Sequence, residues 1–208
     1  MDLKIAIQEN NVQKAEEIIK MELVNNPLDI QWWIKLSLTE LQFPFEDYVS
    51  ALDCIEKIKK ITDNNVDALI LETGIKWHNF GFIEDELLER LSSVDIEDAY
   101  KMSIIYYLQS LYYRCKKEIK DEKKMLNKSI ALHDKFVYPY KALGHIAKVQ
   151  LCVKESKILF LKAFNNIQKI YSDEELYDFT DFNVYVSEFI TGVYISKANY
   201  ENLKALIA

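Results

Sequence analysis

A short pattern that recurs along the chain constrains the fold more than any other feature of the sequence. An anchor residue is followed three positions later by an apolar residue, then directly by a small residue, and three positions beyond by an apolar or aromatic residue. The clearest copy is Tyr140, Leu143, Gly144 and Ala147. The anchors of the copies are Trp33, Ile70, Ile105, Tyr140 and Glu188. The intervals between them are 37, 35, 35 and 48 residues, and a period near 35 predicts stacked copies of one supersecondary unit.

A second pattern follows the anchors by about 16 to 18 residues. It consists of a small residue, a bulky apolar residue four positions later and a further residue three beyond, as in Ser156, Phe160 and Ala163. Such spacing indicates an amphipathic helix, so each unit contains two helices joined by a few polar residues. The chain has only four glycines and three prolines, too few for a sheet-rich fold. These features predict an all-α chain built from helical hairpins.

The two patterns together resemble the tetratricopeptide repeat, which carries a Trp, Leu, Gly and Tyr series and then an Ala, Phe and Pro series over about 34 residues. The resemblance implies a right-handed superhelical stack of antiparallel helical hairpins, a tetratricopeptide-like α-α solenoid. The sequence departs from the family at Glu86 and Glu122, which stand at small-residue positions, and at Glu40, which stands at an aromatic position.

The register predicts one repeat domain over residues 1–208. Its approximate units are 1–29, 30–65, 66–97, 98–135, 136–170 and 184–208. Segment 171–183 interrupts the period, and Ser172 and Glu175 in it have the spacing of a capping box, which predicts an extra short helix. We interpret this segment as a connector before a terminal capping pair, with a regulatory or partner-binding insertion as the alternative.

Charge and cysteine content limit the class of partner and the compartment. Lys and Arg total 26 against 33 Asp and Glu, giving a net charge of -7, which argues against binding nucleic acid through its phosphates. Cys54, Cys115 and Cys152 are isolated and odd in number, which fits reduced thiols in the cytoplasm. The longest uncharged run, 102–113, is too short to span a bilayer, so we expect no membrane segment.

Motifs for catalysis, phosphate binding or metal binding are not visible in the sequence. The glycines at positions 74, 81, 144 and 192 form no phosphate-binding loop. His78, His133 and His145 are far apart, and none is paired with a second His or a Cys at ligand spacing. We therefore expect no enzyme activity, no cofactor and no metal site.

The resemblance also implies where a partner would bind. Tetratricopeptide proteins line their groove mainly with the first helix of each hairpin, at positions two before and one, five, eight and nine after each anchor. In the middle of this chain those positions supply aromatic and basic side chains without a carboxylate. The candidate peptide-binding residues are Tyr106, Tyr113, Arg114, Tyr138, Lys141, His145 and Lys148.

Aromatic and basic groups of this kind favour an acidic or C-terminal peptide segment. Lys141 matches one lysine of the family's carboxylate-clamp set, whereas His145 stands where that set has an Asn, so no clamp is predicted. Alternatively, the tyrosines pack between helices and the lysines form an ordinary solvated face.

The function predicted from these features is a non-enzymatic protein-protein interaction module, an adaptor or chaperone-like scaffold that holds a segment of another protein. Two alternatives stay open: a structural subunit that self-associates, as a homo-oligomer or in a larger assembly, and an inhibitor or immunity-type protein that masks a partner.

Overall fold

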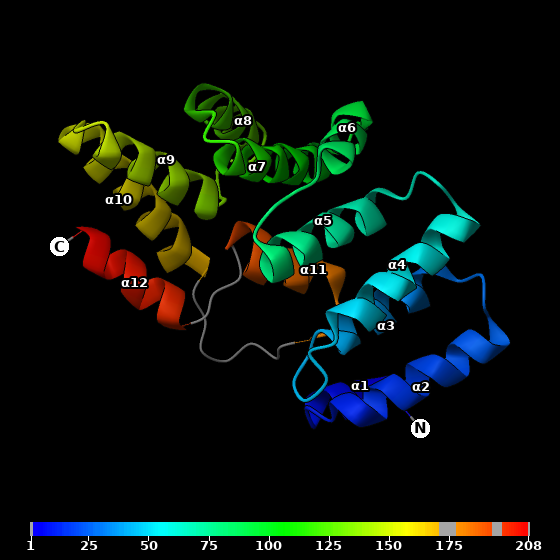
Figure 1. Cartoon of the computed structure of the whole chain (residues 1–208). Helices are drawn as coiled ribbons and strands as arrows, with labels where there is room; N and C mark the ends of the chain where they lie inside the picture. The colour runs from blue at the N-terminus through cyan, green and yellow to red at the C-terminus, as the bar shows by residue number, and fades with distance from the viewer. Residues whose placement is uncertain (1, 171–177, 193–196, 208) are drawn as a thin grey trace. The chain divides into compact units, whose positions relative to one another are not determined.

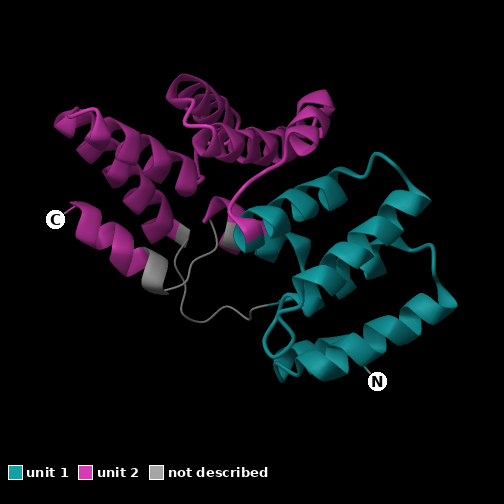
Figure 2. Cartoon of the chain, in the orientation of Figure 1, with its two compact units in different colours: residues 1–79, 174–185 teal, residues 80–173, 186–208 magenta. Residues whose placement is uncertain are grey.

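The computed structural model describes residues 2–170, 178–192 and 197–207. Within these ranges the chain forms helices and no strand (Figure 1). The chain divides into two compact units (Figure 2). Unit 1 comprises residues 1–79 and 174–185, and unit 2 comprises residues 80–173 and 186–208. The prediction of a single repeat domain with the boundaries given above stays a prediction.

Unit 1 is built from successive helices of which α1 packs on α2, α2 on α3 and α3 on α4, while the short α11 also contacts α3. Aspartate side chains cap helices of this unit at their N-termini; for example, Asp29 accepts from the amide of Gln31, and Asp47 accepts from two amides of α4. The helices are α1 (Leu3–Gln8), α2 (Val12–Asn25), α3 (Ile30–Glu40), α4 (Tyr48–Ile61), α5 (Val66–Phe80) and α11 (Phe182–Tyr185).

Unit 2 contains two helical hairpins and the elements packed on them. The first hairpin is α7 with α8 and the second is α9 with α10, and α8 also packs on α9. The elements are α6 (Asp85–Ser93), α7 (Ala99–Cys115), α8 (Ile119–Leu132), α9 (Tyr138–Val149), α10 (Val153–Ile170), the π-helix η1 (Val186–Thr191) and α12 (Lys197–Ile207). The helix α6 contacts α7, η1 contacts α7 and α9, and α12 packs against α10.

Small residues of the two sequence patterns meet inside the hairpins. In the α9–α10 hairpin the Ser156 hydroxyl donates to the carbonyl oxygen of Gly144 at 2.9 Å. In the α3–α4 hairpin the Ser37 hydroxyl donates to the carbonyl oxygen of Ala51, also at 2.9 Å. A hydroxyl can reach a carbonyl of the neighbouring helix only where the two backbones approach closely. The small residues therefore mark the crossing points of the hairpins.

Glycine is required at two positions of unit 2 by close packing. A Cβ added to Gly144 would lie 2.6 Å from Cε1 of Phe160, and one added to Gly192 would lie 2.6 Å from Cε1 of Tyr138. Gly192 also has a φ of +65°, a conformation that favours glycine. Gly144 thus lets α9 approach α10, and Gly192 lets the end of η1 lie against Tyr138.

Part of the predicted interruption lies outside the described residues. Ser172 and Glu175 are in that part, so the predicted capping box and the short helix that it would start stay a prediction. Further on, the Asp178 side chain accepts from the amide and the hydroxyl of Thr180, and α11 begins at Phe182.

Candidate functional site

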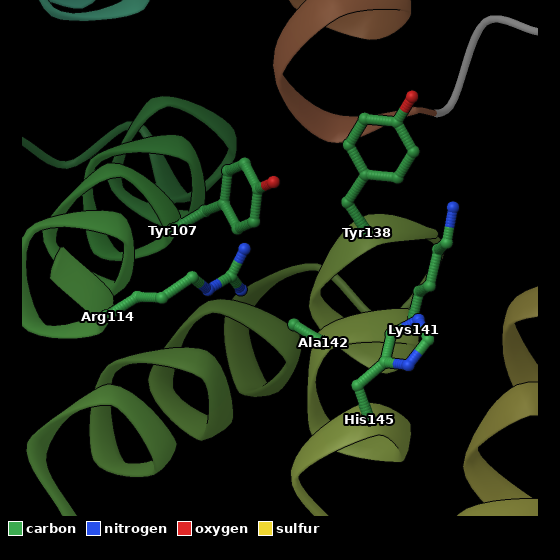
Figure 3. Close-up of a pocket in the computed structure, with 6 residues that line it drawn as sticks. All are labelled: Tyr107, Arg114, Tyr138, Lys141, Ala142 and His145. Carbon is green, nitrogen blue, oxygen red and sulfur yellow. The ribbon is translucent and has the colours of Figure 1, made fainter. Parts of the chain in front are cut away.

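Four of the seven predicted groove residues line one cavity of about 200 Å³ in unit 2. Arg114 comes from the last turn of α7, and Tyr138, Lys141 and His145 come from one side of α9. Figure 3 shows Arg114 reaching from α7 toward the helix that carries the other three. We call this space the anion cavity. Its walls also include Tyr107 and Ala142.

Tyr107 is the buried polar group of the anion cavity. Its side chain is 6% exposed, and burial raises the pKa of its phenol while the nearby Arg114 charge partly opposes that rise. In Figure 3 the hydroxyl of Tyr107 is directed away from its own helix, into the space that the labelled residues line. Among the described residues, none forms a hydrogen bond with this hydroxyl. A hydroxyl that has no partner in the protein can donate a hydrogen bond to a ligand atom that enters the cavity.

Arg114 is held by an ion pair with a buried acid. Its Nε donates to Oε1 of Glu122 at 2.8 Å, and the Glu122 side chain is only 6% exposed. Glu122 is the acidic residue that stands at a small-residue position of the repeat, so the pair explains how the hairpin accommodates it. The fork of a guanidinium offers five N–H donors. Donors other than Nε can therefore still bind a second acceptor in the cavity.

Lys141 brings a second positive charge to the anion cavity. Its ammonium lies 5.7 Å from the ring centroid of Tyr138, and burial lowers its pKa. Among the described residues no carboxylate lies within ion-pair distance of this ammonium. A half-buried ammonium without a carboxylate partner is a favourable site for an anionic ligand.

His145 also lines the anion cavity, and its imidazole can gain or lose a proton near neutral pH. Its ring packs edge-on against Phe160, with 5.0 Å between centroids and an interplanar angle of 72°. Partial burial lowers its pKa, and the positive charges of Lys141, Lys148 and Arg114 lower it further. The imidazole is therefore biased toward its neutral form.

Three predicted residues do not line the anion cavity. Tyr106 lies under the ammonium of Lys128, at 4.7 Å from its ring centroid, and Tyr113 packs edge-on against Tyr112. Lys148 is exposed and acts on the site through its effect on the pKa of His145. That these three residues contact a partner stays a prediction.

Sequence reasoning missed Tyr107, which is next to the predicted Tyr106. Successive helical residues are rotated by about 100°, so Tyr106 and Tyr107 lie on different faces of α7, and the family-based offset selects Tyr106. The alternation of polar and apolar residues does not distinguish the two, because tyrosine occurs at both positions.

A second cavity of about 240 Å³ adjoins the first, and we call it the apolar cavity. It shares Arg114 and His145 with the anion cavity. Its remaining walls are Ile119, Glu122, Ile146, Val149 and Gln150. Most of its lining surface is apolar, and Val149 is 78% exposed.

In the part of the chain that the structure describes, no three His, Cys, Asp or Glu residues gather as metal ligands. No helix formed by those same residues has the length and apolar character needed to cross a membrane. The cytoplasmic location stays a prediction.

Solved structures of MamA, a tetratricopeptide-like helical repeat protein, share the fold of this chain. A crystal structure of MamA matches with a TM-score of 0.61 at 18% identity, over 81% of this chain and 96% of the MamA chain. A MamA chain from Desulfovibrio magneticus RS-1, spanning residue 41 to its end, matches with a TM-score of 0.64 at 16% identity, over 82% and 93%. No family model matches the sequence, and no curated protein matches it. The predicted all-α, tetratricopeptide-like fold is thus confirmed, and at these identities the likeness concerns the fold alone.

Proposed function

We propose that this protein is a non-enzymatic protein-binding module, and that its anion cavity receives a carboxylate from a segment of a partner protein. A tetratricopeptide-like fold is an architecture for binding and does not specify what is bound. The proposal therefore depends on the side chains of the cavity.

The observation that carries the proposal is that the Tyr107 hydroxyl, which has no hydrogen-bond partner among the described residues, and Lys141 line the same cavity. A carboxylate has two oxygens with about four acceptor sites. It can accept from the Tyr107 hydroxyl, from the Lys141 ammonium and from an Nη of Arg114 at the same time. Charge-assisted hydrogen bonds of this kind are about twice as strong as neutral ones.

The sign of the local charge supports an acidic ligand. The whole chain has a net charge of -7, whereas the anion cavity is lined by Arg114, Lys141 and His145 and by no carboxylate of the described residues. Glu122 balances one of these charges through its bond to Arg114. The cavity consequently keeps the charge of Lys141 for a ligand.

The proposal is tested with a peptide that has a single carboxylate. We choose Ser-Glu-Pro-Ala-Leu-Ser, acetylated and amidated at its ends, as the reference peptide, and follow its binding by NMR titration of the labelled protein. Lys141→Gln should weaken binding about tenfold, because it removes one charged hydrogen bond.

Lys162→Gln is the matched control for this variant. The Lys162 ammonium also lies over a tyrosine ring, 5.5 Å from the centroid of Tyr140, but it lines neither cavity. Its affinity for the reference peptide should equal that of the native protein. If both lysine variants bind like the native protein, or if no peptide binds at millimolar concentration, the proposed function is wrong.

A further inference from the structure

The anion cavity and the apolar cavity are adjacent and share two side chains, Arg114 and His145. We infer that the two cavities together recognise one extended segment of the partner, which places an acidic side chain in the first cavity and a bulky apolar side chain, three positions away, in the second. This inference rests on the proposed function for its acidic half. Its apolar half depends on separate observations.

The lining of the apolar cavity fits an aliphatic side chain. Ile119, Ile146 and Val149 supply most of its apolar walls, and Val149 and Ile119 are 78% and 43% exposed. Covering apolar surface that faces water lowers the free energy of the complex, so these side chains favour binding of an apolar group. A volume of about 240 Å³ accommodates a leucine-sized group.

Glu122 sets which group enters which cavity. It lines the apolar cavity and is absent from the lining of the anion cavity. In the apolar cavity its carboxylate offsets the charge of Arg114, whereas the anion cavity also has Lys141, whose charge no carboxylate among the described residues of that cavity balances and which attracts an acidic group. The Arg114–Glu122 pair, at 2.8 Å, therefore separates an acid-binding side from an apolar side.

The geometry of α9 gives the spacing between the two side chains. This helix lines the anion cavity from Tyr138 to His145 and the apolar cavity from His145 to Gln150. The midpoints of these stretches are roughly six residues apart, or about 9 Å along the helix axis. A polyproline II segment rises about 3.1 Å per residue with three residues per turn. Residues three positions apart in such a segment lie on one face and about 9 Å from each other.

The reference peptide has this spacing, with its leucine three positions after its glutamate. The first comparison replaces that leucine by alanine and should weaken binding to the native protein about tenfold, because a buried leucine side chain is lost. Moving the leucine to two or four positions after the glutamate should weaken binding by a similar factor.

The second comparison tests whether the leucine of the peptide binds in the apolar cavity. Val149→Asp adds a carboxylate to the apolar cavity and should abolish the preference for the leucine peptide over the alanine peptide. Val153→Asp is the matched control, because Val153 is also exposed, at 60%, and lines neither cavity. That control should keep the full preference.

The outcomes separate this inference from the proposed function. If the leucine and alanine peptides bind native protein equally while Lys141→Gln still weakens both, the inference is wrong and the proposed function stands. If leucine matters but its position does not, or if Val149→Asp keeps the preference, the inference is also overturned. If Lys141→Gln changes the binding of neither peptide, the proposed function is wrong as well.

Discussion

The guanidinium of Arg114 donates from Nε to the buried Oε1 of Glu122 at 2.8 Å, and both residues line the apolar cavity. This pair replaces the small-residue contact found in the neighbouring hairpin, where Ser156 bonds to Gly144. The α7–α8 hairpin also has a hydroxyl-to-carbonyl bond between its two helices, but at another position of the repeat: the Ser103 hydroxyl donates to the carbonyl oxygen of Ser129 at 2.9 Å. One acidic residue thus changes how the two helices meet and fixes the arginine at the site.

Removing the arginine should destabilise unit 2. Arg114→Leu leaves the buried Glu122 side chain without its partner, and a buried unpaired charge costs about 2 kcal/mol or more. Urea unfolding should show this loss. Adding Glu122→Leu to the same chain should recover most of it, since an apolar pair can replace a buried ion pair. A double variant as unstable as the single one would contradict the account.

Removing the hydroxyl of Tyr107 should separate binding from stability. Tyr107→Phe deletes a group that has no hydrogen-bond partner among the described residues, so thermal stability should stay the same or rise. Affinity for the reference peptide should fall about tenfold, because a hydrogen bond to a charged ligand is lost. A large drop in the melting temperature would mean that the hydroxyl serves the fold instead.

The two glycines with positive φ should respond differently to alanine. Gly81 and Gly192 have φ of +73° and +65°, so alanine strains the backbone at both, by about 1 kcal/mol. A Cβ at Gly81 would meet no atom within 4 Å, whereas at Gly192 it would lie 2.6 Å from Tyr138. Gly192→Ala should therefore cost about 1 kcal/mol more than Gly81→Ala in urea unfolding. Equal losses would show that Tyr138 moves aside freely.

Binding of an acidic peptide should depend on pH through His145. Its pKa is held below 6.5 by partial burial and by the positive charges of Lys141, Lys148 and Arg114. A bound carboxylate favours the protonated ring, so affinity for the reference peptide should rise as the pH falls from 8 to below 6. The variant His145→Gln should lose this rise. An identical pH profile in both proteins would contradict the assignment.

The lowered pKa of His145 also predicts that stability depends on pH in the opposite direction to peptide affinity. Because the folded protein binds a proton at His145 less readily than the unfolded chain, the unfolded chain takes up more protons as the pH falls through about 6.5. In the absence of peptide, the free energy of unfolding should therefore decrease as the pH falls below about 6.5. His145→Gln should reduce the decrease, which pH-dependent urea unfolding would measure.

The repeat register predicts packing better than it predicts the site. Gly144, Ser156 and Phe160 were found from spacing alone, because crossing points of a hairpin recur with the repeat. The ion pair of Arg114 with Glu122 depends on where α7 and α8 cross, which the sequence does not give once a small residue is replaced. Tyr107 and Tyr106 differ by one helical position, and the sequence pattern does not show which of the two tyrosines lines the cavity.

We propose that a carboxylate binds beside Tyr107, Lys141 and His145. The most direct measurement is an NMR titration of the native protein with the reference peptide and with its glutamine counterpart, which differs by one charge. We predict that the glutamate peptide binds about tenfold more tightly and that the largest amide shifts fall at Tyr107, Lys141 and His145. Equal binding of the two peptides, or shifts centred on unit 1, would contradict the claim.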